Sequence, residues 1–140
     1  MTLETAVAII DKILELGATR KAPPLTVAVV DPAGMLMALK RQDGSPLIRP
    51  DVALGKARTC IFWGKSSRGF AKLTADRASF ASAASDLAIS PLVPAAGGIH
   101  VLSGDGVLLG AVGVSGDTSD NDEAMATFAL EQLGLKTLAD

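Results

Sequence analysis

Residues 93–123 have the sequence VPAAGGIHVLSGDGVLLGAVGVSGDTSDNDE. This segment contains a glycine pair, the single histidine of the chain, two apolar runs and a group of acidic residues. The apolar runs, Ile99–Leu102 and Val107–Ser115, are rich in β-branched residues, and the turn-forming sequence Ser-Gly-Asp-Gly separates them. The segment therefore predicts a β-hairpin, and the rest of the fold is predicted around it.

The turn of this hairpin sets its register. A two-residue turn at Asp105-Gly106 would pair Gly104 with Val107 and would place His100 opposite Ala111. Small residues would then surround the imidazole, because Gly98 lies two residues before His100 on the same face of the strand. Such a surface leaves room either for a ligand or for a second segment of backbone.

A helix is predicted to begin directly after the hairpin. Ser119, followed by Asp122 three residues later, resembles a capping box. Asp120, Asp122 and Glu123 would all lie in the first turn, where the helix dipole favours negative charge. Either Asp122 or Glu123 is also a candidate partner for a basic residue of the helix predicted around residue 56.

The same acidic residues, together with Asp117, raise the question of a cation site. As a calcium loop the segment fails, because its sixth position is Asp122 instead of glycine and its twelfth is Phe128 instead of glutamate. Helix capping explains these carboxylates without a metal and is the favoured interpretation.

Periodicity and turn chemistry predict the other elements. They are a helix over residues 3–16 capped by Thr2 and ended by Gly17, strands over 25–30 and 35–41, a helix from residue 50 to about residue 64, one or two short helices within 66–87, a short extended segment within 89–96, and a last helix stopped by Gly134. Because hairpins supply the strands, we expect an α/β fold of the α+β kind, with a mainly antiparallel sheet of about five strands flanked by helices. The 140 residues suit a single domain, 1–140.

Composition narrows the class of protein. Hydrophobic residues make up 49% of the chain but aromatic residues only 4%, so the core is predicted to be aliphatic. Thirteen basic and fifteen acidic residues give a net charge of −2, which argues against nucleic acid or an anionic membrane as the partner. The single cysteine, Cys60, indicates a reducing compartment and a small buried side chain. With no signal-peptide pattern and no long apolar run, a cytoplasmic protein is expected.

Two side chains are the main candidates for chemistry. His100 has the right side chain for an iron ligand or a general acid/base, and a hydrogen-bonded structural histidine is the alternative. Lys56 is a candidate for binding a ligand carboxylate or for a structural ion pair. Arg58 lies two residues further along the same predicted helix and points to another face, so the two cations cannot hold one anion together.

Four pieces of the sequence resemble the GlcG/HbpS-like proteins, also described as haem-binding or DUF336 domains. These are VAVVDPAGMLMALKRQDG at 27–44, the Lys-Ala-Arg-Thr run at 56–59, the glycine pair at 97–98, and LLGAVGVSGDTSDNDE at 108–123. Together they span nearly the whole chain, and the last piece is the most specific. The family also includes the C-terminal domain of some cobalamin adenosyltransferases.

This resemblance implies a profilin-like sandwich that assembles into homo-oligomers, with haem or another small molecule bound by some relatives. Several members come from operons for the catabolism of small organic acids and diols, which implies an accessory role in such a pathway. The position of His100 is often proline in relatives, so no haem ligand carries over from the family to this residue.

The leading hypothesis is a homo-oligomeric protein that binds a small molecule, with haem or a related tetrapyrrole as the candidate. Its pocket would lie between the hairpin and the helix around residue 56. The predicted ligand-binding residues are Lys56, Gly97, Gly98, His100, Asp122 and Glu123, with His100 as the candidate haem iron ligand. One alternative is a catabolic enzyme of the isomerase, lyase or hydrolase type that uses His100 to move a proton. Another is an oligomeric accessory protein without a ligand.

Overall fold

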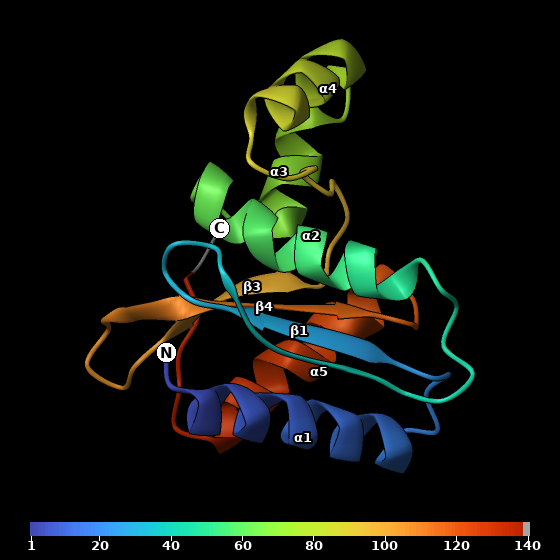
Figure 1. The fold of residues 1–140 in the computed structure, drawn as a ribbon, viewed down its shortest axis with the longest axis vertical. Helices are drawn as coiled ribbons and strands as arrows, with labels where there is room; N and C mark the ends of the chain where they lie inside the picture. Colours follow the sequence, from blue (N-terminus) through green and yellow to red (C-terminus); the bar gives the residue numbers. More distant parts are fainter. Residues whose placement is uncertain (139–140) are drawn as a thin grey trace.

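The computed structural model describes residues 1–138, which form five α-helices and one open, four-stranded antiparallel sheet (Figure 1). In chain order the elements are α1 (Leu3–Thr19), β1 (Thr26–Val30), β2 (Leu36–Arg41), α2 (Arg49–Trp63), α3 (Ser67–Thr74), α4 (Ala78–Leu87), β3 (Gly98–Leu102), β4 (Leu108–Ser115) and α5 (Ser119–Gln132). The α+β class and the antiparallel sheet are confirmed.

The sheet has the strand order β2-β1-β4-β3, so the two predicted hairpins meet through the pairing of β1 with β4. The expected number of about five strands is wrong for the described residues, because no strand forms within 89–96. Pro91 and Pro94 have no backbone N–H to give to a ladder. Instead, the N–H of Leu92 donates to Ser85 Oγ and that of Val93 donates to Thr59 Oγ1. Side chains hold this segment in place of a neighbouring strand.

The helices cover the two faces of the sheet unequally (Figure 1). Helices α1 and α5 lie side by side on one face, where they bury branched aliphatic residues against the strands. Helix α2 covers the other face and contacts three of the strands closely, and the start of α3 touches β3 at its edge. Helices α3 and α4 continue beyond α2, and α4 contacts the rest of the protein mainly through α3. The molecule is therefore layered, with α4 projecting from one side.

The predicted register of the hairpin is confirmed, since His100 pairs with Ala111. The predicted pairing of Gly104 with Val107 is wrong. The N–H of Ser103 donates to Val107 O, and the register shifts by one residue between Val101 and Leu102. Gly106 has a φ of +89°, which permits a three-residue loop ending in a left-handed residue in place of the two-residue turn.

The helix ends confirm some capping predictions and correct others. Thr2 caps α1 by accepting from the N–H of Thr5, as predicted. Gly17 does not end this helix. It is buried within it, and a Cβ there would lie 2.6 Å from Leu25 Cδ1, so glycine serves close packing. Helix α5 is capped by Thr118, whose hydroxyl accepts from the N–H of Asn121, and not by the predicted Ser119.

Candidate functional site

Two glycines on the face of the sheet under α2 let this helix approach closely. A Cβ added at Gly113 would lie 2.0 Å from the carbonyl oxygen of Ala53, and one at Gly98 would lie 2.3 Å from that of Lys56. Both carbonyls belong to α2, so the backbone of this helix touches the strands directly. Of the two occupants that the sequence left open for this glycine-lined space, the structure shows the backbone of the protein itself.

His100 lies under the last turns of α2 and is only 3% exposed. Its Nε2 is 2.9 Å from the carbonyl oxygen of Cys60, so this nitrogen carries the proton and donates it. This hydrogen bond joins β3 to α2. A buried histidine with a structural role makes a contact of this kind. Iron ligation or proton transfer by His100 stays a prediction, and either role needs access to a ring that α2 covers.

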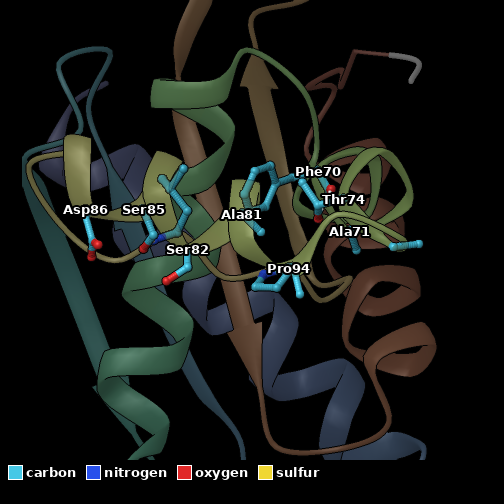
Figure 2. Close-up of a pocket in the computed structure, with 11 residues that line it drawn as sticks. Phe70, Ala71, Thr74, Ala81, Ser82, Ser85, Asp86 and Pro94 are labelled. Atoms are coloured by element: carbon cyan, nitrogen blue, oxygen red, sulfur yellow. Dashed lines mark hydrogen bonds between the residues drawn. The ribbon is translucent and has the colours of Figure 1, made fainter.

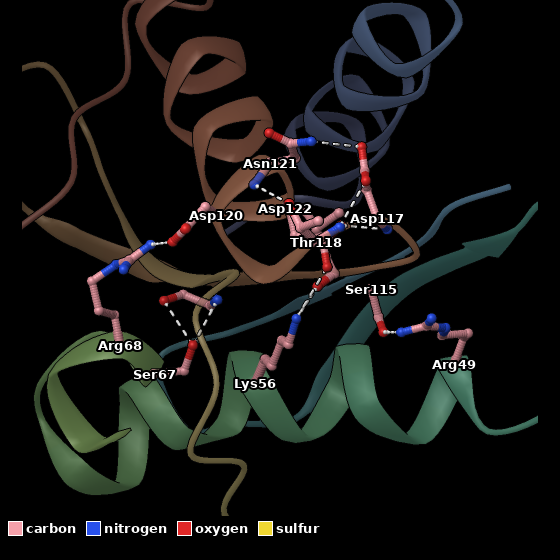
Figure 3. A network of polar contacts seen from close by, with 12 residues as sticks. Arg49, Lys56, Ser67, Arg68, Ser115, Asp117, Thr118, Asp120, Asn121 and Asp122 are labelled. Atoms are coloured by element: carbon pink, nitrogen blue, oxygen red, sulfur yellow. Dashed lines mark hydrogen bonds and ion pairs between the residues drawn. The ribbon is translucent and has the colours of Figure 1, made fainter. Parts of the chain in front are cut away.

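Lys56 forms the ion pair that the sequence predicted as one of its two roles (Figure 3). Its Nζ lies 3.2 Å from Asp122 Oδ2 and donates to Val114 O at 2.9 Å. Both side chains of the pair are at most 3% exposed. Burial lowers the pKa of Lys56 below its ordinary value, and the carboxylate of Asp122 opposes that shift. The pair joins α2 to α5 across the end of the sheet.

The surroundings of this pair are closed. Gly97 has a φ of +118°, and a Cβ there would lie 2.8 Å from Lys56 Nζ, so glycine lets the lysine pass. Asp122 Oδ1 also accepts from the N–H of Asp117. The predicted residues Lys56, Gly97, Gly98 and Asp122 therefore do come together, in a buried cluster where Lys56 Nζ already has two acceptors. Ligand binding by this group stays a prediction.

Glu123, the remaining predicted residue, pairs with Arg68 at the start of α3. Arg68 Nε lies 2.7 Å from Glu123 Oε1. Its guanidinium also contacts Asp120 at 2.5 Å (Figure 3). These two carboxylates raise the pKa of Arg68. Sequence reasoning missed Arg68, since no local pattern links it to acids more than fifty residues away. Across the described residues, no group of three His, Cys, Asp or Glu side chains could hold a metal ion.

Two open cavities lie away from this group, on the two sides of α4. One hollow of about 490 Å³ is partly polar and includes Ser82, Ser85 and Asp86 (Figure 2). The second, which we call the aromatic hollow, also has a volume of about 490 Å³. It is lined by Phe62, Trp63, Phe80, Ala83, Ala84, Leu87, Ala88, Ile89 and Leu92. None of the predicted ligand-binding residues lines either one.

The aromatic hollow combines rigid rings with exposed aliphatic side chains. Trp63 packs edge to face against Phe80, with ring centroids 6.0 Å apart. Leu87 and Ile89 are 89% and 84% exposed at its edge. The guanidinium of Arg77 lies 4.3 Å from the centroid of the Phe80 ring, so a positive charge lies next to the hollow. No local pattern in the sequence marks Phe80, Leu87 or Arg77 as part of a site.

A family model and several solved structures match this chain. Residues 1–131 match the family model described as haem degrading protein HbpS-like. No curated protein matches the chain in sequence. In the part of the chain that the structure describes, none of the helices has the length and hydropathy of a membrane span.

Three solved structures show the similarity in fold. A double mutant of HbpS from Streptomyces reticuli is 28% identical with a TM-score of 0.80, covering 95% of this chain and 86% of its own. The PduOC:heme complex has a TM-score of 0.86 at 21% identity, covering 99% of both chains. The Klebsiella pneumoniae protein ORFY, assigned to DUF336, has a TM-score of 0.74 at 21% identity, covering 94% of this chain and 88% of its own.

Proposed function

Because the chain belongs to the HbpS-like family of haem-degrading proteins, we propose that it binds haem or a related tetrapyrrole in the aromatic hollow. The observation that carries the proposal is an apolar, aromatic-lined hollow of about 490 Å³ on a chain of this family. Ligand pockets of roughly 300–1,000 Å³ with such linings are the usual small-molecule sites of proteins.

The residues of the hollow suit two parts of a haem molecule. The rings of Phe62 and Trp63 and the exposed aliphatic chains of Leu87 and Ile89 offer contacts to a flat apolar ring. Arg77 is outside the lining, but its guanidinium lies over the ring of Phe80, which does line the hollow, and it can pair with a propionate carboxylate. The PduOC:heme complex shows that a protein of the same fold binds haem.

These residues provide no axial ligand for the haem iron. Within the described part of the chain, no histidine, cysteine, methionine or tyrosine lines the aromatic hollow. His100 lies beneath α2 with its Nε2 on the Cys60 carbonyl. Haem would therefore be bound through its porphyrin ring and its propionates. Axial ligation by His100 is a separate prediction, which the same experiment can decide.

Two further expectations belong to this proposal. A homo-oligomer is expected, and the exposure of Leu87 and Ile89 supports it, since a second copy would cover them and deepen the hollow. An accessory role in the catabolism of small organic acids or diols is the expected biological setting. The description of the family also names haem degradation, so an enzymatic role stays the alternative.

The test is a titration with haemin followed by the Soret band. Leu87→Glu should weaken binding by about tenfold or more, because it places a charge against the apolar ring. Leu87 is 89% exposed, so the fold tolerates the change, and Leu47→Glu is the matched control at an 84% exposed leucine outside the hollow. Equal binding by wild type and Leu87→Glu would reject this site.

His100→Ala separates the two haem predictions. Binding in the aromatic hollow leaves the position of the Soret band unchanged in this variant, whereas axial ligation by His100 requires the band to shift or weaken. The same samples, given ascorbate as reductant, should be followed for loss of the Soret band. Loss that depends on intact protein would support the enzymatic alternative.

A further inference from the structure

A third cavity lies on the outer side of α2, away from the sheet. We call it the Arg58 pocket. It has a volume of about 370 Å³ and is bounded by α2 and by the segment that connects α4 to β3. Its lining is mostly apolar, with Ile48, Val52, Leu54, Pro91 and Val93 among its residues. It shares no lining residue with the aromatic hollow.

The walls of the Arg58 pocket are held in place by tight contacts. A Cβ added at Gly55 would lie 2.6 Å from Val93 Cγ2, so the connecting segment rests directly on α2. The N–H of Val93 donates to Thr59 Oγ1 at 2.8 Å. The cavity is therefore formed by fixed backbone.

Two polar groups in this pocket have unused hydrogen-bonding capacity. Arg58 is half-buried, and its Nε donates to Gly34 O at 3.0 Å, which orients the guanidinium. Among the described residues Arg58 forms no ion pair, and no hydrogen bond is made by its two terminal nitrogens. The hydroxyl of Ser90 is buried and has no hydrogen-bond partner in the described part of the chain.

A carboxylate would complete a pocket whose lining includes both a half-buried guanidinium without an anion and a buried hydroxyl without a partner among the described residues. The planar fork of arginine matches the two oxygens of a carboxylate, and a serine hydroxyl can donate to the same group. The apolar remainder of the lining suits an apolar tail on the ligand. Asp51 lies at the same pocket, two helical turns from Arg58, and its charge disfavours a second negative group on the ligand.

We propose that the Arg58 pocket binds a small monocarboxylate with an apolar tail, held by the guanidinium of Arg58 and the hydroxyl of Ser90. This site is separate from the aromatic hollow and does not depend on haem binding.

Calorimetric titration with benzoate tests the proposal, with benzamide as the neutral ligand of the same shape. Benzoate should bind and benzamide should not compete. Arg58→Gln should weaken benzoate binding by about tenfold or more, since a hydrogen-bonded charge is lost. Ser90→Ala should weaken it by a smaller factor. Lys65→Gln is the matched control, because it removes one positive charge at an exposed position outside the pocket.

A second variant keeps the proposal testable if Arg58→Gln disturbs the fold. Ile48 is 60% exposed at the mouth of the pocket, so Ile48→Glu should fold normally and repel benzoate. Equal binding of benzoate by wild type, Arg58→Gln and Ile48→Glu would overturn the proposal, as would equal binding of benzamide. So would the absence of binding by acetate, butyrate and benzoate at millimolar concentration.

Haemin provides the last arm of the test, because its propionates are also carboxylates. Arg58→Gln should leave haemin binding unchanged, whereas Leu87→Glu should leave benzoate binding unchanged. If Arg58→Gln weakened haemin binding as strongly as benzoate binding, the pocket would be part of the haem site, and a separate monocarboxylate site would be wrong.

Discussion

The two faces of the sheet are packed in opposite ways. Toward α1 and α5 the strands present branched aliphatic residues, namely Val27, Val29, Ile99, Val101, Val112 and Val114. Toward α2 they present small or polar residues, among them Gly98, His100, Ala111 and Gly113. Large aliphatic side chains bury apolar surface and can repack when a neighbour changes size. The first face therefore stabilises the fold without requiring one exact position of the helices. The second face depends on absent Cβ atoms and matched polar partners, so it determines where α2 must lie.

The largest predicted effect comes from breaking the buried ion pair on the α2 side. Asp122→Ala leaves the ammonium of Lys56 buried without its carboxylate, which should lower the free energy of unfolding by about 3–5 kcal/mol. Asp120→Ala is the matched control, because the carboxylate of Asp120 is 81% exposed in its pair with Arg68 and should contribute about 0–1 kcal/mol. Urea unfolding measures both. Equal losses in the two variants would contradict the distinction between buried and surface pairs.

A single methyl group tests the difference between the faces directly. Gly113→Ala adds a methyl where Ala53 O lies 2.0 Å away, so it should destabilise the protein by about 1–3 kcal/mol or more. Ile10→Val removes a methyl from the buried α1 face and should cost about 0.5–1.5 kcal/mol. Thermal or urea unfolding compares them. A smaller loss for Gly113→Ala than for Ile10→Val would show that α2 can move away from the sheet freely.

The smallest predicted effect is a pH dependence confined to the α2 side. Burial lowers the pKa of Lys56 in the folded state, so between that lowered pKa and 10.5 the unfolded chain binds more protons than the folded one. The free energy of unfolding should therefore rise with pH in this window, relative to the double variant Lys56→Met/Asp122→Leu. Urea midpoints at several alkaline pH values measure the difference. A difference that falls with pH would mean that Asp122 outweighs burial.

Local sequence patterns predicted the hairpin well, because alternation and turn residues act between near neighbours. The pairing of His100 with Ala111 followed from these signals alone. The same reasoning chose the wrong turn length, since Asp-Gly suits a two-residue turn and a three-residue loop ending at Gly106 equally. It also chose Ser119 over Thr118 as the cap of α5, because adjacent hydroxyl residues give the same signal.

The candidate site was predicted in part. Lys56 was expected either in an ion pair or at a ligand, and Asp122 or Glu123 as its partner, and the pair of Lys56 with Asp122 is confirmed. Arg68 was missed because its contacts with α5 depend on how α3 docks. The aromatic hollow was missed for a similar reason, since α4 has an Ala- and Ser-rich sequence and its exposed side chains form a wall only in the folded arrangement.

The sequence by itself determined the class of fold, the hairpin register, most of the helices and the resemblance to a family, because propensity, periodicity and turn chemistry depend on residues close together in the chain. Only the tertiary structure decided what occupies the space beside Gly98 and His100. A glycine-lined surface accepts a ligand and a helix backbone equally well, and close approach of α2 is a property of three-dimensional packing. The space that the sequence left open is filled by α2, and the cavities lie on its outer side and around α4.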